Sequence, residues 1–243
     1  MFLPDPSATS TRPPIQRGGY AYTKEPREEL PSTFIPPYAT VKLTSTPLQY
    51  LFLQYKRLRY KARNVFALCV FKLSSPADPN GRWYSRTVKL HGGRITPTAL
   101  ALHKQMYSAF AEGDSQTLRK ICTDGLYDSF MARLAARRKG EQVVWELVQY
   151  NRRAKMVSNR AARYPIEGSG VMQAVVRIDS TQRLTRLDQD GEVIGGSGKA
   201  KDAVEYLVLQ KQFHKWTGAE WRVWGTVEET DLDTLRAWEK DDD

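Results

Sequence analysis

The pattern of hydrophobic and polar positions changes its period near Gly140. Before this residue, apolar side chains recur at every third or fourth position, which is the spacing of one face of an α-helix. After it, apolar and polar residues alternate, which is typical of strands buried on one side. Helices first and antiparallel strands afterwards predict an α+β domain, with the helices packed on one face of a curved sheet.

Start and stop signals give approximate bounds for these elements. Helices are expected from Leu48 to about Leu73, from Thr96-Pro97 to about Glu112, after the capping residue Asp114, and from Thr123 or Asp124 to Gly140. Strands are expected around residues 143–148, 172–179, 206–213 and 221–227, with turns at residues 188–191 and at Thr217-Gly218. A short acidic helix from Asp231 to Trp238 is expected to finish the chain.

Proline marks off the N-terminal part of the chain. Nine of the 13 prolines fall within residues 1–47. Proline lacks a backbone donor and biases the preceding residue toward extended conformations, so this stretch is predicted to be an extended arm. We therefore divide the chain into an extended proline-rich arm (1–47), a basic amphipathic helix with its linker (48–95), and an α+β domain with a short acidic C-terminal helix (96–243).

Charge is distributed unevenly along the 243 residues, and this is the first indication of function. The net charge of +10 conceals a segment, 48–163, with 22 basic and only 7 acidic side chains, followed by an acidic segment, 164–243. Fourteen of the 22 basic residues are arginine, whose guanidinium binds phosphate in a bidentate manner. The middle of the chain is therefore predicted to bind a polyanion.

The first predicted helix combines this charge with an apolar side. At about 100° per residue, one arc of the helix carries only apolar residues. These are Leu48, Leu51, Tyr55, Leu58, Ala62, Val65, Phe66 and Cys69, and most of the basic residues lie on the opposite arc. Three interpretations stay open: a core-packing helix with a solvated face, a helix that contacts RNA, and a helix that lies on a membrane surface.

Signs of catalysis and of metal binding are weak. The two cysteines and three histidines have no metal-ligand spacing, and Gly195–Ala200 departs from a phosphate loop at Val193 and Ala200. Asp179 is a carboxylate on an alternating strand and is expected to be a solvated surface residue. The longest apolar run, Val65–Phe71, is too short to span a membrane. We expect no catalytic residue, cofactor, metal ion or small-molecule substrate.

A family resemblance appears between Thr98 and Val227. Its most specific pieces are Ala111-Glu112-Gly113-Asp114, Ser180-Thr181-Gln182 after an alternating strand, and Trp221–Val227. This block resembles the C-terminal domain shared by the scaffold of the mitochondrial import motor, the fungal inner-membrane ribosome receptor and a protein of the mitochondrial large ribosomal subunit. The resemblance implies a cone-shaped α+β domain and a non-enzymatic scaffold on the matrix side of the inner membrane.

The import-motor scaffold is similar only in this block, because its N-terminal region is long, charged and helical, whereas this chain has a short arm and one basic helix. This difference favours the two ribosome-associated proteins of the resemblance over the import-motor scaffold. The expected function is that of a structural protein of the mitochondrial large ribosomal subunit, which binds rRNA near the polypeptide exit and helps to place the ribosome at the inner membrane. The alternative is a peripheral inner-membrane scaffold of the import motor.

Candidate contact residues follow from where the positive charge is concentrated. Phosphate contacts are expected from Lys56, Arg57, Arg59, Lys61 and Arg63, from Arg137, Arg138 and Lys139, and from Arg152, Arg153 and Lys155. Arg160 and Arg163, placed in a loop before Tyr164-Pro165, are candidates for membrane contact. The expected partners are rRNA and neighbouring large-subunit proteins, with peripheral contact to the inner membrane or its insertase.

Overall fold

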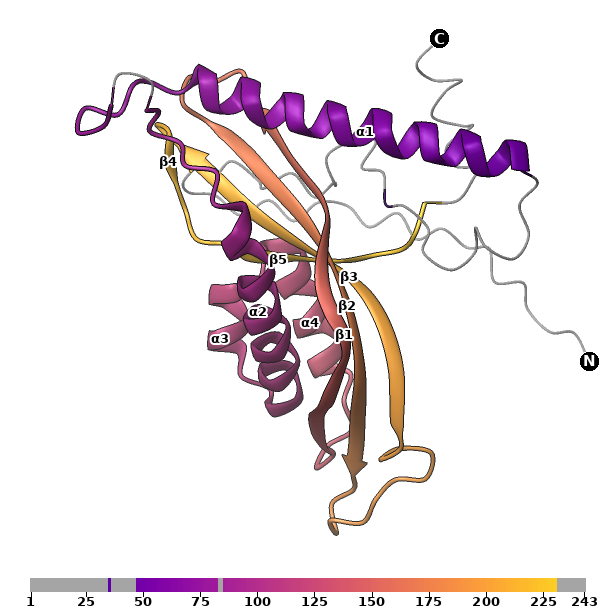
Figure 1. The fold of residues 1–243 in the computed structure, drawn as a ribbon. Coiled ribbons are helices and arrows are strands. Elements are labelled where there is room, and N and C mark those ends of the chain that lie inside the picture. The colour runs from indigo at the N-terminus through magenta and orange to yellow at the C-terminus, as the bar shows by residue number, and fades with distance from the viewer. Residues whose placement is uncertain (1–34, 36–46, 83–84, 231–243) are drawn as a thin grey trace, which may run out of the picture.

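The computed structural model describes residues 35, 47–82 and 85–230, drawn in colour in Figure 1. In this part of the chain, four helices accompany one five-stranded antiparallel sheet. The helices are α1 (Pro47–Ser74), α2 (Gly92–Glu112), α3 (Ser115–Ile121) and α4 (Asp124–Ala135), and the strands are β1 (Gln142–Arg163), β2 (Gly170–Leu187), β3 (Ala200–His214), β4 (Thr217–Gly218) and β5 (Arg222–Val227). The α+β fold with helices on a curved antiparallel sheet is confirmed.

The sheet is built from hairpins in the order β1-β2-β3, with β4 and β5 both pairing with β3. β1 and β2 pair from Gln142↔Leu187 to Arg163↔Gly170, with four register shifts that mark bulges or irregularities in the ladder. The turn before β4 differs from the expected one. Lys215 and Trp216 form it with φ of 47° and 63°, while Thr217 and Gly218 pair back onto β3.

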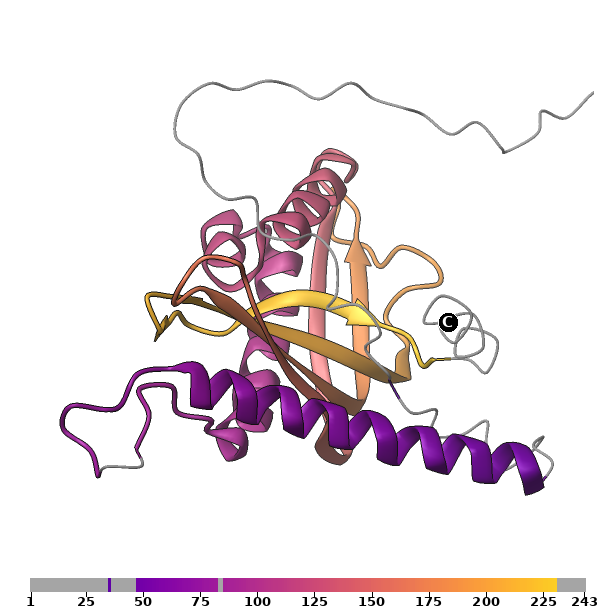
Figure 2. The same cartoon turned by 90° about the horizontal axis from the view of Figure 1, so that it is seen from above.

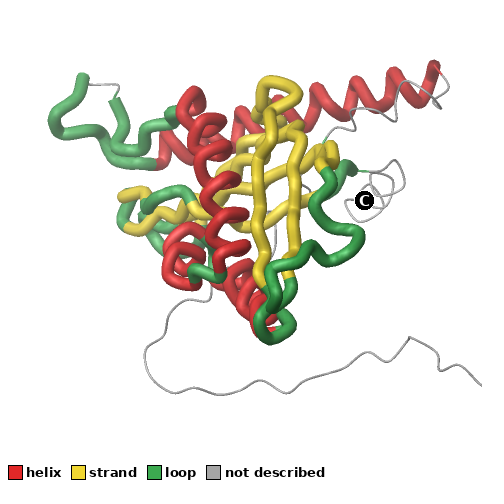
Figure 3. Tube along the Cα trace, turned by 90° about the horizontal axis from the view of Figure 1, so that it is seen from below, coloured by secondary structure: helices red, strands yellow, loops and turns green. Residues whose placement is uncertain are grey.

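Helices α2, α3 and α4 cover one face of the sheet, as Figure 3 shows from below. The core between the two layers is apolar. Its buried members include Ile95, Ala99 and Met106 from α2 and alternate residues of β2 and β3. Apolar side chains recur about every 3.6 residues in the helix and every two residues in the strands, so both sets point into the space between the layers.

Capping residues explain the boundary between α2 and α3. Gly113 ends α2 with φ of 77°, and the Asp114 side chain accepts hydrogen bonds from the backbone N–H groups of Gln116 and Thr117 at the start of α3. Both agree with the predicted signals. α2 begins at Gly92 rather than at Thr96-Pro97, so Pro97 lies inside the helix. α4 ends at Ala135, before the run of three basic residues that follows.

Helix α1 lies apart from the other three and crosses one end of the sheet (Figures 1 and 2). It packs on β1 through a narrow side, where Asn64 Nδ2 donates to Ser158 Oγ at 3.1 Å. At its C-terminal end the Phe71 ring is 1% exposed and meets the Phe213 ring edge-on, with 5.0 Å between the centroids. A Cβ at Gly170 would lie 2.6 Å from this ring, so glycine permits the close approach.

The second face of the sheet carries a smaller apolar cluster. Val175, Tyr206 and Val208 are buried there together with Ile35, whose carbonyl accepts from the backbone N–H of Thr230 at 3.0 Å. Ile35 thus has a place on the domain, whereas the rest of the predicted arm up to residue 46 lies outside the described residues. The predicted helix from Asp231 to Trp238 lies outside them as well.

Candidate functional site

The apolar arc of α1 faces away from the sheet. Its six large members, from Leu48 to Phe66, have exposed fractions between 54% and 78%. Those six are Leu48, Leu51, Tyr55, Leu58, Val65 and Phe66. The side that packs on the domain is a different one. Phe71 is buried there in an apolar cluster with Met172 and Phe213, and Leu53 is buried as well. The interpretation of this arc as a core-packing surface is therefore wrong, since the arc stays exposed in the described part of the chain.

One predicted phosphate ligand of α1 is buried. Lys56 is 3% exposed, and its ammonium lies 5.2 Å from the centroid of the Phe52 ring. Lys56 follows Leu53 by three residues, so it lies on the packed side of the helix. The prediction that Lys56 faces phosphate is wrong. The other four basic residues of the cluster, Arg57, Arg59, Lys61 and Arg63, are exposed.

These four residues border the apolar arc on both sides. At about 100° per residue, Arg59 lies next to one edge of the arc and Lys61 next to the other, while Arg63 and Arg57 lie further round on these two sides. The 28 residues of α1 contain no acidic side chain. The outward surface of α1 is therefore an apolar stripe between two basic margins, and we refer to it as the α1 stripe.

The two residues proposed for membrane contact belong to the same region. Both lie on β1, which continues to Arg163, and not in a loop as predicted. Arg160 is half-buried beside α1, where burial and the positive charge of Arg63 lower the pKa of its guanidinium. Arg163 Nη1 donates to Ser74 Oγ at the end of α1, at 2.8 Å. The membrane and RNA candidates therefore meet at the contact between α1 and β1.

The basic run after α4 divides into two roles. Arg137 donates to the backbone oxygens of Phe110 and Ala111, at 2.6 and 2.9 Å, and its guanidinium lies over the Phe110 ring. Desolvation by burial lowers the pKa of this guanidinium. Arg137 thus caps the last carbonyls of α2, so the prediction that it faces phosphate gives way to a structural role. Arg138 and Lys139 are exposed.

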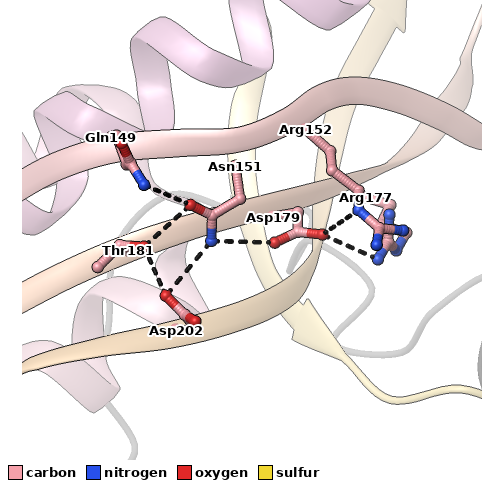
Figure 4. Close-up of polar contacts among 7 residues, drawn as sticks. All are labelled: Gln149, Asn151, Arg152, Arg177, Asp179, Thr181 and Asp202. Carbon is pink, nitrogen blue, oxygen red and sulfur yellow. Dashed lines mark hydrogen bonds and ion pairs between the residues drawn. The ribbon is translucent and has the colours of Figure 1, made fainter.

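The third basic cluster lies on β1, close to an acidic network drawn in Figure 4. Arg152 Nε is 3.5 Å from Asp179 Oδ2, which Arg177 also contacts at 3.2 Å. Asn151 and Thr181 link this pair to Asp202. Asp179 is thus a counter-ion to two arginines rather than a solvated carboxylate. All three residues of the predicted cluster are exposed on the strand, but Arg152 is engaged with Asp179, which leaves Arg153 and Lys155 as the candidates for phosphate.

Sequence reasoning missed a buried polar group beneath the helices. The Glu205 carboxylate accepts hydrogen bonds from the Tyr107 hydroxyl and from Gln182 Nε2, and His103 Nε2 lies 2.9 Å from it. Burial alone would raise the pKa of Glu205, but the hydrogen bonds from these three side chains hold it below its ordinary value. The partners are up to 102 residues apart, so no local pattern links them. His103 is the buried core histidine that the helix pattern predicts.

A cavity of about 470 Å³ lies next to this network. Its walls are Tyr107, Phe110 and Trp145 on one side and the loop between β2 and β3 on the other. Among residues 35, 47–82 and 85–230, no cluster of His, Cys, Asp or Glu has the geometry of a metal site. No helix in the same ranges is long and apolar enough to cross a bilayer.

Comparison with known proteins gives two matches. The family described as "MBA1-like protein" matches residues 33–243. An uncharacterized protein of Schizosaccharomyces pombe is 30% identical over 145 residues, which amounts to 58% of this chain and 49% of that protein. The chain therefore matches about half the length of this curated relative.

Proposed function

The chain belongs to the MBA1-like protein family. From this premise, we propose that it is a structural protein of the mitochondrial large ribosomal subunit. In this role it would bind rRNA near the polypeptide exit and help to place the ribosome at the inner membrane. Family membership identifies, at a coarse level, a mitochondrial protein that associates with the ribosome. The family match over residues 33–243 is the observation that carries the proposal. We further propose that the protein acts without catalysis, on the matrix side of that membrane.

The geometry supports particular rRNA contacts. Arg138 and Lys139 follow α4, and Arg153 and Lys155 lie more than ten residues further along the chain on β1, all with exposed side chains. At about 3.3 Å per residue of strand, the two pairs are separated by roughly 30 to 40 Å. Two separate basic points suit a folded RNA surface, because each neutralises different phosphates and releases its own counterions. Neighbouring large-subunit proteins are the proposed protein partners.

Co-sedimentation with mitochondrial large ribosomal subunits tests the assignment. The full-length protein should stay with the subunit at high salt, in near-stoichiometric amount. Release into a membrane or translocase fraction would favour an import-motor scaffold and would contradict the ribosomal assignment. This experiment does not depend on which surface of the protein meets lipid.

Salt dependence tests the four rRNA contacts. Replacing Arg138, Lys139, Arg153 and Lys155 together with glutamine should make the slope of log K against log salt shallower by about three units, at roughly 0.7 to 0.9 per phosphate. The matched control replaces four exposed lysines elsewhere, namely Lys104, Lys199, Lys201 and Lys215. Equal slopes for the two quadruple variants would remove the proposed contacts.

A further inference from the structure

We propose that α1 lies flat in the interface of an anionic lipid bilayer, with the α1 stripe inserted among the lipids and its basic margins at the headgroups. The proposal rests on the proposed function for its setting, because that function brings the protein to a membrane. It goes further by naming the contact surface, the orientation of the helix and the chemistry of the lipid.

The first argument is the continuity of the exposed apolar surface. Single exposed apolar residues are ordinary, but a large contiguous apolar patch on a soluble domain marks a surface that is covered in use. The α1 stripe runs from Leu48 to Leu73, and at about 1.5 Å per residue it is close to 40 Å long. A straight apolar strip of this length fits a planar boundary better than it fits a local pocket.

The second argument is charge. Arg57, Arg59, Lys61 and Arg63 border the stripe, and Arg160 and Arg163 lie on the strand beneath it. Long basic side chains can lay their methylene groups along the apolar phase while their charged ends stay in water. A helix with no acidic residue and with basic residues on both margins has the pattern of an interfacial helix on an anionic surface.

The same charges argue against two other occupants. A second copy of this chain would bring two sets of unbalanced basic margins together, and the charges would repel each other. An RNA surface would neutralise the margins but would leave the apolar stripe between them against phosphates and water. An anionic bilayer satisfies both parts of the surface. The proposal therefore reassigns the α1 basic residues from rRNA to lipid.

The third argument is the way α1 is held. Its packed side contacts the domain through Phe71, and through the hydrogen bonds Asn64–Ser158 and Ser74–Arg163. The helix can therefore present its stripe without leaving the sheet. Docking needs no unfolding and no exposure of the core.

Vesicle flotation of the full-length protein is the direct test. The protein should float with vesicles of phosphatidylcholine and cardiolipin in about a four-to-one ratio, and much less with phosphatidylcholine alone, because each basic residue near an anionic surface adds about a fivefold factor to binding. Raising the salt should weaken the binding, since the attraction fades within a Debye length. A protein that does not float with the anionic vesicles at low salt overturns the proposal.

Two triple variants test whether vesicle binding requires the α1 stripe or only exposed apolar side chains anywhere on the protein. Replacing Leu51, Leu58 and Phe66 with glutamine keeps helix propensity and should lower the partition coefficient about a hundredfold. The matched control replaces Val144, Val193 and Val204 with glutamine, because these side chains are also about half exposed but lie on the β1, β2–β3 loop and β3 segments. Equal flotation of the two triple variants overturns the proposal, as does loss only in the control.

A thiol label reports insertion without any change of fold. Cys69 lies on the α1 stripe and is exposed, whereas Cys122 is buried and desolvation raises its pKa to about 12, so a thiol-reactive dye attaches at Cys69. The emission of a polarity-sensitive dye at Cys69 should shift to the blue on adding the anionic vesicles. A C69S/S129C variant places the dye on α4 and should show no shift. A shift at residue 129 with none at residue 69 would mean that another face meets the lipid.

The two proposals fail separately. If the stripe variant loses vesicle binding but still co-sediments with the large subunit, both stand. If the wild-type protein binds vesicles and leaves the ribosome at high salt, the ribosomal assignment fails and the lipid surface stands. If it stays on the ribosome and the Cys69 dye is unchanged by vesicles, the lipid surface alone fails.

Discussion

Helices α1 and α2 have similar amphipathic sequences and opposite relations to the domain. α2 turns its apolar side to the sheet and buries Ile95, Ala99 and Met106 there. α1 turns its apolar arc outward and attaches by a narrow side, with Leu53, Phe71 and even Lys56 on the packed face. An apolar stripe on a helix therefore predicts a contact surface, but it does not identify the partner. The partner is the helix's own domain only when the apolar side is the side that packs on the sheet.

The largest expected effect separates the two sides of α1 itself. Phe71→Ala removes a ring that is 1% exposed and should lower the free energy of unfolding by about 3–5 kcal/mol. Phe66→Ala, at a position 70% exposed on the same helix, should change it by no more than about 0.5 kcal/mol. Urea denaturation of both variants provides the measurement. Similar losses for the two would mean that the α1 stripe is covered within the free protein.

A smaller effect should come from the polar group that supports α2. Glu205→Gln leaves donors from Tyr107, Gln182 or His103 without their carboxylate, which should cost about 2–3 kcal/mol at neutral pH. Because the folded pKa of Glu205 lies below its ordinary value of 4.5, the carboxylate stabilises the fold above that value. The stabilisation is lost as the pH falls through the lowered folded pKa.

The difference between wild type and Glu205→Gln should therefore narrow below about pH 4.5, as measured by urea denaturation across the acid range. Glu228→Gln is the control, since Glu228 is exposed. A gap that stays constant down to low pH would show that the charge of Glu205 contributes nothing to stability.

The smallest effect distinguishes two neighbouring arginines. Arg137→Gln removes two hydrogen bonds to the end of α2 and should lower the free energy of unfolding by about 1–2 kcal/mol. Arg138→Gln should leave stability unchanged and weaken only RNA binding, since its side chain is exposed. Thermal unfolding beside an RNA-binding titration measures both. If the two variants behave alike in both assays, the distinction between a capping and a ligand-binding arginine is wrong.

The fold was largely predictable because its signals are local. Gly113 and Asp114 act through the backbone of their own neighbours, and the change of period at Gly140 needs no knowledge of distant contacts. The extent of β1 was not predictable in the same way. Its second half, residues 153–163, mixes small, polar and basic residues without a clear alternation, and it continues as a strand because β2 pairs with it as far as Arg163.

The candidate contacts were less predictable, because a basic residue looks alike in sequence whatever it touches. Lys56 and Arg59 are three residues apart, yet one is buried and the other exposed. Arg137 and Arg138 are adjacent, yet one reaches carbonyls 26 residues away in the chain. The sequence predicted where positive charge is concentrated. The packing of α1 and α4 decides which of these charges remain for a partner.

Strand β1 has a mechanical consequence for the two ends of the molecule. α2 meets it at Trp145, through ring contacts with His103 and Tyr107, while α1 meets it from Ser158 onward. The intervening residues span roughly 40 Å of strand and are held in a ladder to β2. Because one strand contacts both the helical layer and α1, a movement of either is coupled to the other through β1. The four irregular positions of the ladder lie between these two contacts, and they are where the strand can bend.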